Sequence, residues 1–238
     1  MKRSVEKRDA SEELRAVARA SSLLDGAAEE ALRELGSLAL CHEYPVNNVL
    51  FYQGEPGGGA FLVMSGRVKL SLANEEGREV VVGLVPPGGF LGLIPALDGG
   101  AHPTNAITVA KSRLAKFDGQ ALLAWMERHA VAQRGLPREL GRCARQAYQK
   151  LGDYALLSVK ERLLATLLEI AEREGQHESG GEAIVFTRPT HQELAERIGS
   201  SREVVSRILK ELLESDLLEA EGRVIRVSES ALVLKGEE

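Results

Sequence analysis

The sequence predicts an α+β protein with an N-terminal antiparallel β-roll, a long dimerisation helix and a C-terminal winged helix-turn-helix. Three patterns carry this prediction: short apolar runs with frequent turns in the first half, an apolar stripe with heptad-like spacing after them, and two closely spaced short helices followed by a strand pair. The predicted parts are an N-terminal extension (1–21), the β-roll (22–118), a helical region (119–156) and the winged helix-turn-helix (157–238).

Length and composition indicate two domains and no membrane span. The chain has 238 residues, 44% of them hydrophobic and 27% charged, as in soluble globular proteins. No apolar run approaches the roughly 18 residues of a transmembrane helix, and the charged N-terminus lacks the apolar core of a secretory signal. Two cysteines, Cys41 and Cys143, cannot form a disulfide framework, so we expect a reducing cytoplasm. A net charge of −5 argues against bulk polyanion binding but allows a local basic face.

The first half of the sequence has the pattern of two helices followed by strands. Residues 1–20 and 23–35 have helical spacing. Over residues 44–117, short apolar runs alternate with turns rich in Gly, Pro, Asn and Asp, which is typical of a small antiparallel barrel or roll. The predicted strands are 49–52, 61–64, 68–72, 80–85, 107–109 and 113–117.

A long helix is predicted to begin at Pro137, since proline has no N–H to lose in the first helical position. A short helix over 120–129, which contains Trp125, precedes it. Apolar residues then recur at steps of four and three for about two heptads. This stripe packs either on its own β-roll or against a second copy of the chain, and the motifs below favour the dimer. The expected dimer contacts are Leu140, Cys143, Ala144, Ala147, Leu151 and Tyr154.

Two capping boxes indicate a helix-turn-helix in the last third of the chain. A helix over 159–174 and a strand over 183–186 precede it. Residues 190–193 and 200–203 both have the S/T-x-x-E form, which satisfies free N–H groups at a helix start. Gly199 lies between them and can adopt the left-handed conformation that ends a helix.

The second of these helices has two chemically different sides. One is apolar, and the other presents polar and charged groups over about 140°. Such a polar side is also typical of an ordinary solvated helix, but strands at 217–219 and 224–227 add a wing, which favours DNA binding. The predicted base-reading residues are Arg202, Glu203, Ser206 and Arg207. The predicted phosphate-binding residues are Thr190, His191, Gln192, Ser200, Ser201, Lys210 and Arg223.

The charge balance of the C-terminal part limits how much of its surface can be positive and bind DNA. Over residues 155–238, 17 acidic residues outnumber 11 Lys and Arg residues. The contact surface must therefore be positive only locally. Because phosphate neutralisation supplies most non-specific affinity, we expect moderate affinity and weak non-specific binding.

The helix-turn-helix sequence THQELAERIGSSREVVSRILKEL, at 190–212, resembles that of Crp/Fnr-type bacterial transcription regulators. FYQGEP at 51–56 and FLVMSGRVKLS at 61–71 resemble the cyclic-nucleotide-binding β-roll of the same family. The resemblance covers residues 22–228. It implies a homodimer, paired through the long helix, that converts effector binding into binding of a palindromic operator, and it adds RNA polymerase to the expected partners.

The family resemblance extends to the base-reading residues. Glu203, Ser206 and Arg207 resemble the E-x-x-S-R pattern of the oxygen-responsive branch. Arg202 matches a guanine-reading position of the cyclic-AMP-responsive members. The resemblance therefore implies an operator with TGTGA-like or TTGA-like arms.

The effector site departs from the pattern of the cyclic-nucleotide-binding members. In those proteins a G-E-L cassette, followed about ten residues later by Arg-Ser or Arg-Thr, grips the phosphate and ribose. Here Leu93 stands where the Glu is expected, and residues 102–106 contain no Arg. A cyclic phosphate needs a guanidinium or several N–H donors, so we expect no useful affinity for cyclic AMP. The degenerate effector pocket is assigned to Gly92, Leu93, Thr104 and Asn105.

Other chemistry has little support in the sequence. Two cysteines cannot hold a cubane iron–sulfur cluster, and adjacent Cys41 and His42 point to opposite faces of a strand. One of His42, His102, His129 and Cys41 as a haem ligand is an alternative that the sequence leaves open. This alternative corresponds to a second candidate function, a ligand- or redox-sensing module that acts mainly through protein contacts. No nucleophile–base motif, H-E-x-x-H or phosphate loop occurs, so we predict no enzyme, metal or cofactor.

Overall fold

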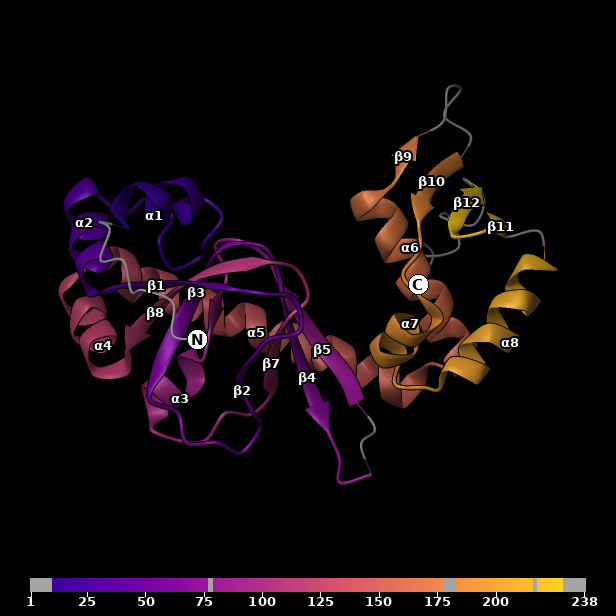
Figure 1. Cartoon of the computed structure of the whole chain (residues 1–238), viewed down its shortest axis with the longest axis horizontal. Coiled ribbons are helices and arrows are strands. Elements are labelled where there is room, and N and C mark those ends of the chain that lie inside the picture. Colours follow the sequence, from indigo (N-terminus) through magenta and orange to yellow (C-terminus); the bar gives the residue numbers. More distant parts are fainter. Residues whose placement is uncertain (1–9, 77–78, 178–182, 216–217, 229–238) are drawn as a thin grey trace. The chain divides into compact units, whose positions relative to one another are not determined.

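The structure is a computed structural model that describes residues 10–76, 79–177, 183–215 and 218–228. The chain divides into two compact units, with the boundary between Tyr148 and Gln149 (Figure 1). Among the described helices, none is long and apolar enough to cross a membrane. The predicted helix over 1–20 and the predicted wing strand at 217–219 lie partly outside the described residues.

The first unit contains the predicted antiparallel β-roll. Its strands form two four-stranded sheets, with the orders β1-β8-β3-β6 and β2-β7-β4-β5 (Figure 1). The strands are β1 (Leu40–Tyr44), β2 (Val49–Phe51), β3 (Gly59–Ser65), β4 (Val68–Ala73), β5 (Glu79–Val85), β6 (Phe90–Leu91), β7 (Asn105–Thr108) and β8 (Ser112–Asp118). All six predicted strands are confirmed. The edge strand β1 was not predicted because His42 and Glu43 interrupt its apolar residues, and β6 has only two residues, too few to give a pattern.

Four helices accompany these sheets: α1 (Ser11–Ala18), α2 (Glu29–Leu38), α3 (Leu93–Asp98) and α4 (Gly119–Arg128). Leu14 of α1, Leu35 of α2 and Trp125 of α4 are fully buried in one apolar cluster with residues of β3 and β8. An ion pair adds to this packing, since Arg113 of β8 donates to both carboxylate oxygens of Glu13 at 2.6 and 3.0 Å. Helix α1 is therefore packed onto the β-roll.

The sequence predicted that the second helix begins at residue 23, but α2 begins at Glu29. Leu23 and Leu24 are fully buried in a preceding turn, which ends at Gly26 with a φ of 79°. A positive φ is incompatible with a right-handed helix. The apolar residues before Gly26 therefore reflect the burial of a turn and not the side of a helix.

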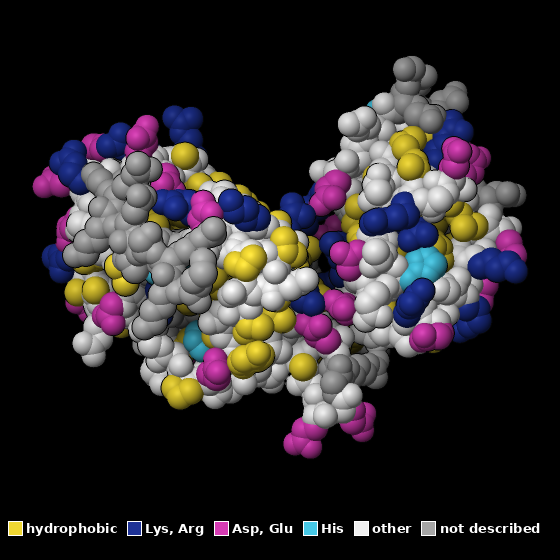
Figure 2. Space-filling view, viewed as in Figure 1, with side chains coloured by type: hydrophobic (Ala, Val, Ile, Leu, Met, Phe, Trp, Pro, Cys, Tyr) yellow, Lys and Arg dark blue, Asp and Glu magenta, His cyan; other side chains and the backbone are white. Residues whose placement is uncertain are grey.

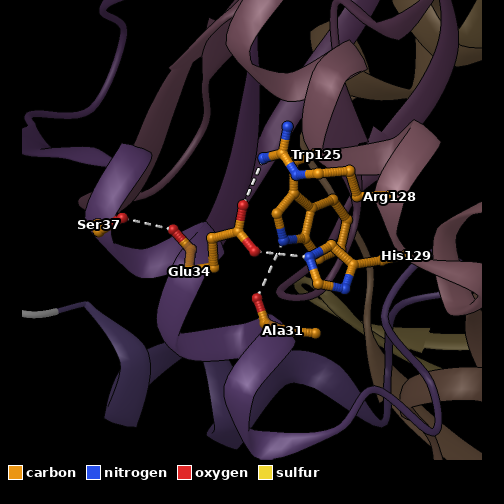
Figure 3. A network of polar contacts seen from close by, with 6 residues as sticks. All are labelled: Ala31, Glu34, Ser37, Trp125, Arg128 and His129. Carbon is orange, nitrogen blue, oxygen red and sulfur yellow. Dashed lines mark hydrogen bonds and ion pairs between the residues drawn. The ribbon is translucent and has the colours of Figure 1, made fainter.

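Polar contacts around Trp125 hold α2 against α4 (Figure 3). The indole Nε1 donates to the carbonyl oxygen of Ala31 at 3.0 Å. The Glu34 carboxylate bonds Arg128 and also lies 2.8 Å from His129 Nε2. The hydrogen bond with Arg128, followed by that with His129, holds the pKa of Glu34 below its ordinary value. The carboxylate therefore stabilises this contact as an ion.

The long helix α5 runs from Ala130 to Leu156, so the prediction that it begins at Pro137 is wrong. A proline inside a helix removes one hydrogen bond and places its ring against the carbonyl four residues before it. Packing outweighs this cost here. Ala132 is fully buried, and a Cβ at Gly135 would lie only 2.5 Å from the carbonyl oxygen of Ser22. The turn before α2 thus holds the segment ahead of Pro137 in the helix.

The second unit is the predicted winged helix-turn-helix. Its elements are α6 (Val159–Glu174), β9 (Gln176–His177), β10 (Ala183–Thr187), α7 (His191–Ile198), α8 (Arg202–Leu213), β11 (Leu218–Glu221) and β12 (Val224–Ser228). The strands form one sheet of order β11-β12-β10-β9, and β11 pairs with β12 about Gly222. The three helices and the sheet share one buried apolar cluster.

One of the two predicted capping boxes is confirmed. Thr190 and Glu193 form a complete box at the start of α7, which ends at Gly199 with a φ of 61°. The second box is wrong, because Ser201 and not Ser200 caps α8 by accepting from Val204 N at 3.3 Å. The backbone N–H of Ser200 instead donates to Ala195 O and closes α7. An unpredicted box, formed by Ser158 and Glu161, starts α6.

Glu34→Gln is expected to lower the thermal unfolding temperature at about pH 7, because it removes the ion that Arg128 and His129 bind. The folded-state pKa of Glu34 is lowered from 4.5. Its stabilisation is therefore complete above that ordinary value and is lost as the pH falls through the lower folded value. The difference between wild type and variant should shrink toward about pH 3. Glu127→Gln on α4 makes the same change of charge and is the control. A difference that does not vary with pH would contradict an ionic role for Glu34.

Candidate nucleic-acid interface and effector pocket

Helix α8 turns its polar side to solvent, as predicted. Its buried side chains are Val205, Ile208, Leu209 and Leu212. Its exposed polar side chains are Arg202, Glu203, Ser206, Arg207 and Lys210, so the four predicted base-reading residues share one surface. Hydrogen bonds from its own backbone N–H and from Ser201 hold the pKa of Glu203 below its ordinary value. Glu203 therefore faces solvent as a carboxylate that only accepts hydrogen bonds.

The two cations in the later part of this helix have partners on the same helix. Arg207 Nη1 donates to Glu211 Oε1 at 2.9 Å, and Lys210 Nζ lies 3.8 Å from Glu214. Exposed pairs four residues apart on a helix contribute only about 0.3–0.5 kcal/mol. Arg207 can therefore exchange Glu211 for another acceptor at little cost.

A cationic cleft lies beside the polar side of α8. It is lined by Arg188, Thr190, His191, Gln192, Arg202 and Arg223. Arg223 donates through Nε and Nη2 to the carbonyl oxygen of Arg188 at 3.2 and 3.0 Å, and burial followed by the charge of Arg223 lowers the pKa of Arg188. None of the residues that line the cleft is acidic. The guanidinium groups of Arg188 and Arg223 thus donate to backbone carbonyls, and no carboxylate lines the cleft, which favours an anion.

His191 lies in this cleft and joins α7 to α8. Its Nδ1 is 2.6 Å from Ser206 Oγ, and its Nε2 is buried without a hydrogen-bond partner among the described residues. Burial, followed by the charges of Arg188 and Arg202, lowers the pKa of His191, so the ring is neutral near neutral pH. Figure 2 shows a histidine surface bordered by Lys and Arg side chains near the place where Figure 1 labels α7.

The structure divides the predicted phosphate-binding residues into two groups. Thr190, His191, Gln192 and Arg223 line the cationic cleft. Ser200, Ser201 and Lys210 lie outside it, in the turn before α8 and on the exposed side of that helix. The Thr190 hydroxyl already donates to Glu193 Oε2 at 2.8 Å.

Sequence reasoning missed Arg188, whose Nη1 donates to Pro189 O at 3.1 Å in the wall of the cationic cleft. A signal for it was present. A basic residue stands directly before Pro189 and Thr190, where the first helix of the pair begins.

The first unit contains a pocket of about 210 Å³ between the β-roll and α5, which is the candidate effector pocket. Its apolar lining includes Phe51, Leu70, Val82, Leu84, Leu93 and Ile94. Leu140, Cys143 and Ala147 of α5 also line it, so three residues of the predicted dimer stripe belong to the pocket wall.

Three of the four predicted pocket residues line this space: Gly92, Leu93 and Thr104. Asn105 does not line it, because its side-chain oxygen accepts from Gln53 N at 2.9 Å. Thr104 lies in the bend directly before β7, whereas Asn105 is the first residue of that strand. Asn105 is therefore not among the residues that line this pocket.

Polar residues of α5 complete the pocket, and sequence reasoning missed them. Glu139 is only 4% exposed, and Arg142 Nε donates to its Oε2 at 3.1 Å while Nη2 bonds its other oxygen. Arg142 Nη1 donates to Gln146 Oε1 at 3.1 Å. The hydrogen bond with Glu139 raises the pKa of Arg142. The three residues recur at steps of three and four beside the apolar stripe, and that spacing was the available signal.

His102 also lines the pocket and carries no charge there. It is 6% exposed and stacks on Phe51, with ring centroids 3.7 Å apart. Burial lowers the pKa of His102, so the ring is neutral near neutral pH.

Cys41 and Cys143 are free thiols whose pKa values are raised by burial. No group of three or more His, Cys, Asp or Glu within the described ranges could hold a metal ion.

The predicted dimer stripe is largely uncovered in one chain. The side chain of Leu151 is 63% exposed, and Tyr148, which the sequence prediction omitted, is 73% exposed. Tyr154 differs from the rest, because its hydroxyl donates to Arg197 O at 3.3 Å and its ring lies under the Arg162 guanidinium. Tyr154 is therefore engaged within the second unit.

Known proteins match both units. The family model of the cyclic nucleotide-binding domain matches residues 41–129, and that of the Crp-like helix-turn-helix domain matches residues 161–233. The cyclic AMP receptor protein of Thermus thermophilus is 30% identical over 190 residues, which cover 80% of this chain and 84% of that protein. The CRP-like cAMP-activated global transcriptional regulator of Mycobacterium tuberculosis is 29% identical over 188 residues, which cover 79% of this chain and 84% of that protein.

Solved structures show the same fold. The c-di-GMP responsive global regulator CLP of Xanthomonas campestris matches with a TM-score of 0.71 at 24% identity, over 84% of this chain and 99% of that chain. The catabolite activator protein of Thermus thermophilus matches with a TM-score of 0.52 at 30% identity, over 90% of this chain and 97% of that chain.

Gly199→Ala is expected to destabilise the helix pair. A left-handed conformation costs a residue with a Cβ about 1–2 kcal/mol, and the new Cβ would lie 2.7 Å from the Tyr154 ring. Gly222→Ala is the matched control, because Gly222 has a φ of 62° but no atom within 4 Å of the point that a Cβ would occupy. Urea unfolding should show a larger loss of stability for Gly199→Ala. Equal losses would contradict the packing of Tyr154 against the turn.

Proposed function

This chain belongs to the Crp/Fnr family of bacterial transcription regulators, and we propose that it acts as a dimer that binds a palindromic DNA site without control by cyclic AMP. It is a DNA-binding regulator and not an enzyme. The observation that carries the proposal is the exposed polar side of α8 beside an acid-free cleft that contains three arginines. Groups that read base edges next to groups that bind phosphate are the combination that DNA recognition requires.

Arg207 and Glu203 read neighbouring base pairs in the major groove. The planar fork of Arg207 donates two parallel hydrogen bonds to O6 and N7 of guanine. Glu203, one turn earlier on the same side, accepts from the N4 amino group of cytosine. Arg202 reads a further guanine. The operator then has TGTGA-like or TTGA-like arms, one for each subunit and about one helical turn apart.

The cationic cleft binds a backbone phosphate and so positions α8. Arg188, Arg202 and Arg223 supply positive charge, and the N-terminus of α7 adds the positive end of its dipole. Ser200, Ser201 and Lys210 bind phosphates outside the cleft. These contacts carry no sequence information, so their effect is to fix the depth and register of α8. The proposal also includes RNA polymerase as a protein that the DNA-bound regulator contacts.

Arg207→Ala is expected to weaken operator binding by about 1–3 kcal/mol and to relax the preference at one guanine in each arm. Arg223→Ala should weaken binding to all sequences alike and lower the salt dependence by about one phosphate contact. Selection from a random DNA pool, followed by titration at several salt concentrations, measures both effects. Arg173→Ala on α6 is a charge-matched control that should change neither. An unchanged base preference in Arg207→Ala would mean that α8 does not read the bases.

The dimer is supported by the exposed apolar stripe of α5. A two-fold contact along this helix would cover Leu140, Ala144, Ala147 and Leu151 of both copies at once, with Tyr148 beside them. Cys143, which is half-buried at the pocket wall, borders the contact. Tyr154 contributes less, because its ring packs within the second unit.

Leu151→Glu should convert the dimer to a monomer, because it places a charge on each copy inside an apolar contact. Light scattering at micromolar concentration measures the mass. Leu156→Glu is the matched control, since Leu156 is also exposed but lies about 140° further round the helix. A monomeric wild-type protein, or a dimer that survives Leu151→Glu, would contradict this interface.

The charge of the effector pocket argues against cyclic AMP, although relatives of this chain are named as cAMP-activated. Arg142 is the only Lys or Arg among the residues that line the pocket, and Glu139 and Gln146 accept from three of its five N–H groups. Freeing it for a phosphate would leave the buried Glu139 carboxylate unpaired, which typically costs about 3–5 kcal/mol. The neutral ring of His102 does not replace the missing charge.

Titration calorimetry with cyclic AMP should therefore show no binding with a micromolar or tighter dissociation constant. Operator binding, measured in parallel, should be the same with and without cyclic AMP. A micromolar dissociation constant would refute this part of the proposal. It would leave the assignment of α8 as the reading helix untouched.

A further inference from the structure

The contact between His191 and Ser206 links a phosphate-binding residue to a base-reading residue. His191 is the first residue of α7, and Ser206 lies on the exposed polar side of α8. The two side chains meet at 2.6 Å, through Nδ1 and Oγ. The other ring nitrogen, Nε2, is buried and has no described hydrogen-bond partner, and the residue itself lines the cationic cleft. One ring nitrogen therefore contacts Ser206, and the other is left for a ligand in the cleft.

The number of hydrogen-bond donors on the imidazole determines how a phosphate in the cleft would change the bond between His191 and Ser206. A neutral imidazole carries one N–H, so one nitrogen donates and the other accepts. In the absence of DNA, either arrangement satisfies the bond to Ser206, because a hydroxyl can donate or accept. A phosphate oxygen can only accept. Once it lies at Nε2, that nitrogen must carry the hydrogen, so Nδ1 becomes the acceptor and Ser206 must donate to it.

We propose that His191 couples the phosphate in the cationic cleft to base selection by Ser206. With its only hydrogen donated to His191, the Ser206 oxygen can act toward DNA only as an acceptor. In the major groove it then selects an amino group, N6 of adenine or N4 of cytosine, and rejects the keto groups of guanine and thymine. His191 is thus a positioning residue for specificity as well as a phosphate ligand.

The surroundings of His191 support this role. Arg188, Arg202 and Arg223 line the same cleft and would hold the phosphate close to Nε2. In the protein without DNA, burial, followed by the charges of the first two, lowers the pKa of the ring, and a neutral ring is required for Nδ1 to accept. The inference rests on the proposed role of α8 as the reading helix.

The test compares the sequences that four proteins select from a random DNA pool: wild type, Ser206→Ala, His191→Phe and the double variant. Wild type should prefer adenine or cytosine roughly tenfold at one position of each arm, and Ser206→Ala should abolish that preference. His191→Phe keeps a ring but has no nitrogen, which frees the Ser206 hydroxyl to donate. It should admit guanine and thymine at the same position and lower affinity about tenfold. In the Ser206→Ala background, His191→Phe should lower affinity without any further change of preference.

Gln192→Ala is the matched control, because Gln192 lines the same cleft but makes no described contact with Ser206. It should lower affinity without changing base preference. Should His191→Phe fail to fold, His191→Ala carries the same expectations. If the preference that depends on Ser206 persists without His191, the coupling is wrong and His191 binds phosphate only. If wild type enriches no sequence, the proposed function itself fails, which is a distinguishable result.

Discussion

Four buried side chains on α8 decide which side of the helix can meet DNA. Val205, Ile208, Leu209 and Leu212 pack into the same cluster as α6, α7 and the wing sheet. Rotation of the helix by one residue, about 100°, would bury charged groups and expose apolar ones, and the cost of burying unpaired charge prevents it. The orientation of the reading surface is therefore set by the core beneath it. Gly199, which lies against the Tyr154 ring, ends α7, and Ser201 sets the point at which α8 begins.

The two concave sites use arginine in opposite ways. In the effector pocket, Arg142 forms an ion pair with a buried carboxylate, which neutralises its charge and takes up two of its N–H groups. In the cationic cleft, Arg188 and Arg223 are held by backbone carbonyls, which orient a guanidinium without cancelling its charge. The same residue type therefore closes one site to anions and opens the other. The difference lies in the partner and not in the arginine.

Charge distribution explains how an acidic protein can bind DNA. The whole chain has a net charge of −5, yet no acidic residue lines the cleft. The acids on α8 either read bases, as proposed for Glu203, or pair along the helix, as Glu211 does with Arg207. Attraction to phosphate is thus concentrated in one place, while the remaining acidic surface weakens non-specific binding. Specificity then depends on base contacts such as those proposed for Arg207 and Ser206.

Local patterns in the sequence determined most of the fold and half of the site. Short alternating runs located six strands, the Thr190 box and Gly199 located the helix pair, and apolar spacing identified the exposed side of α8. These features depend on residues close together in the chain, so their energetics can be read from sequence. The other part was decided by tertiary contacts.

Only the tertiary structure decided that α5 begins before Pro137, that Arg142 is neutralised in the effector pocket, and that Arg188 and His191 share a cleft with the wing. Each of these outcomes depends on a partner at least one structural element away, or on which side of a helix is covered. Packing at Gly135 outweighs the local preference of proline, and the Nδ1–Oγ bond joins residues on two different helices. Sequence spacing can suggest such contacts but does not decide them, because their energy arises only when the chain is folded.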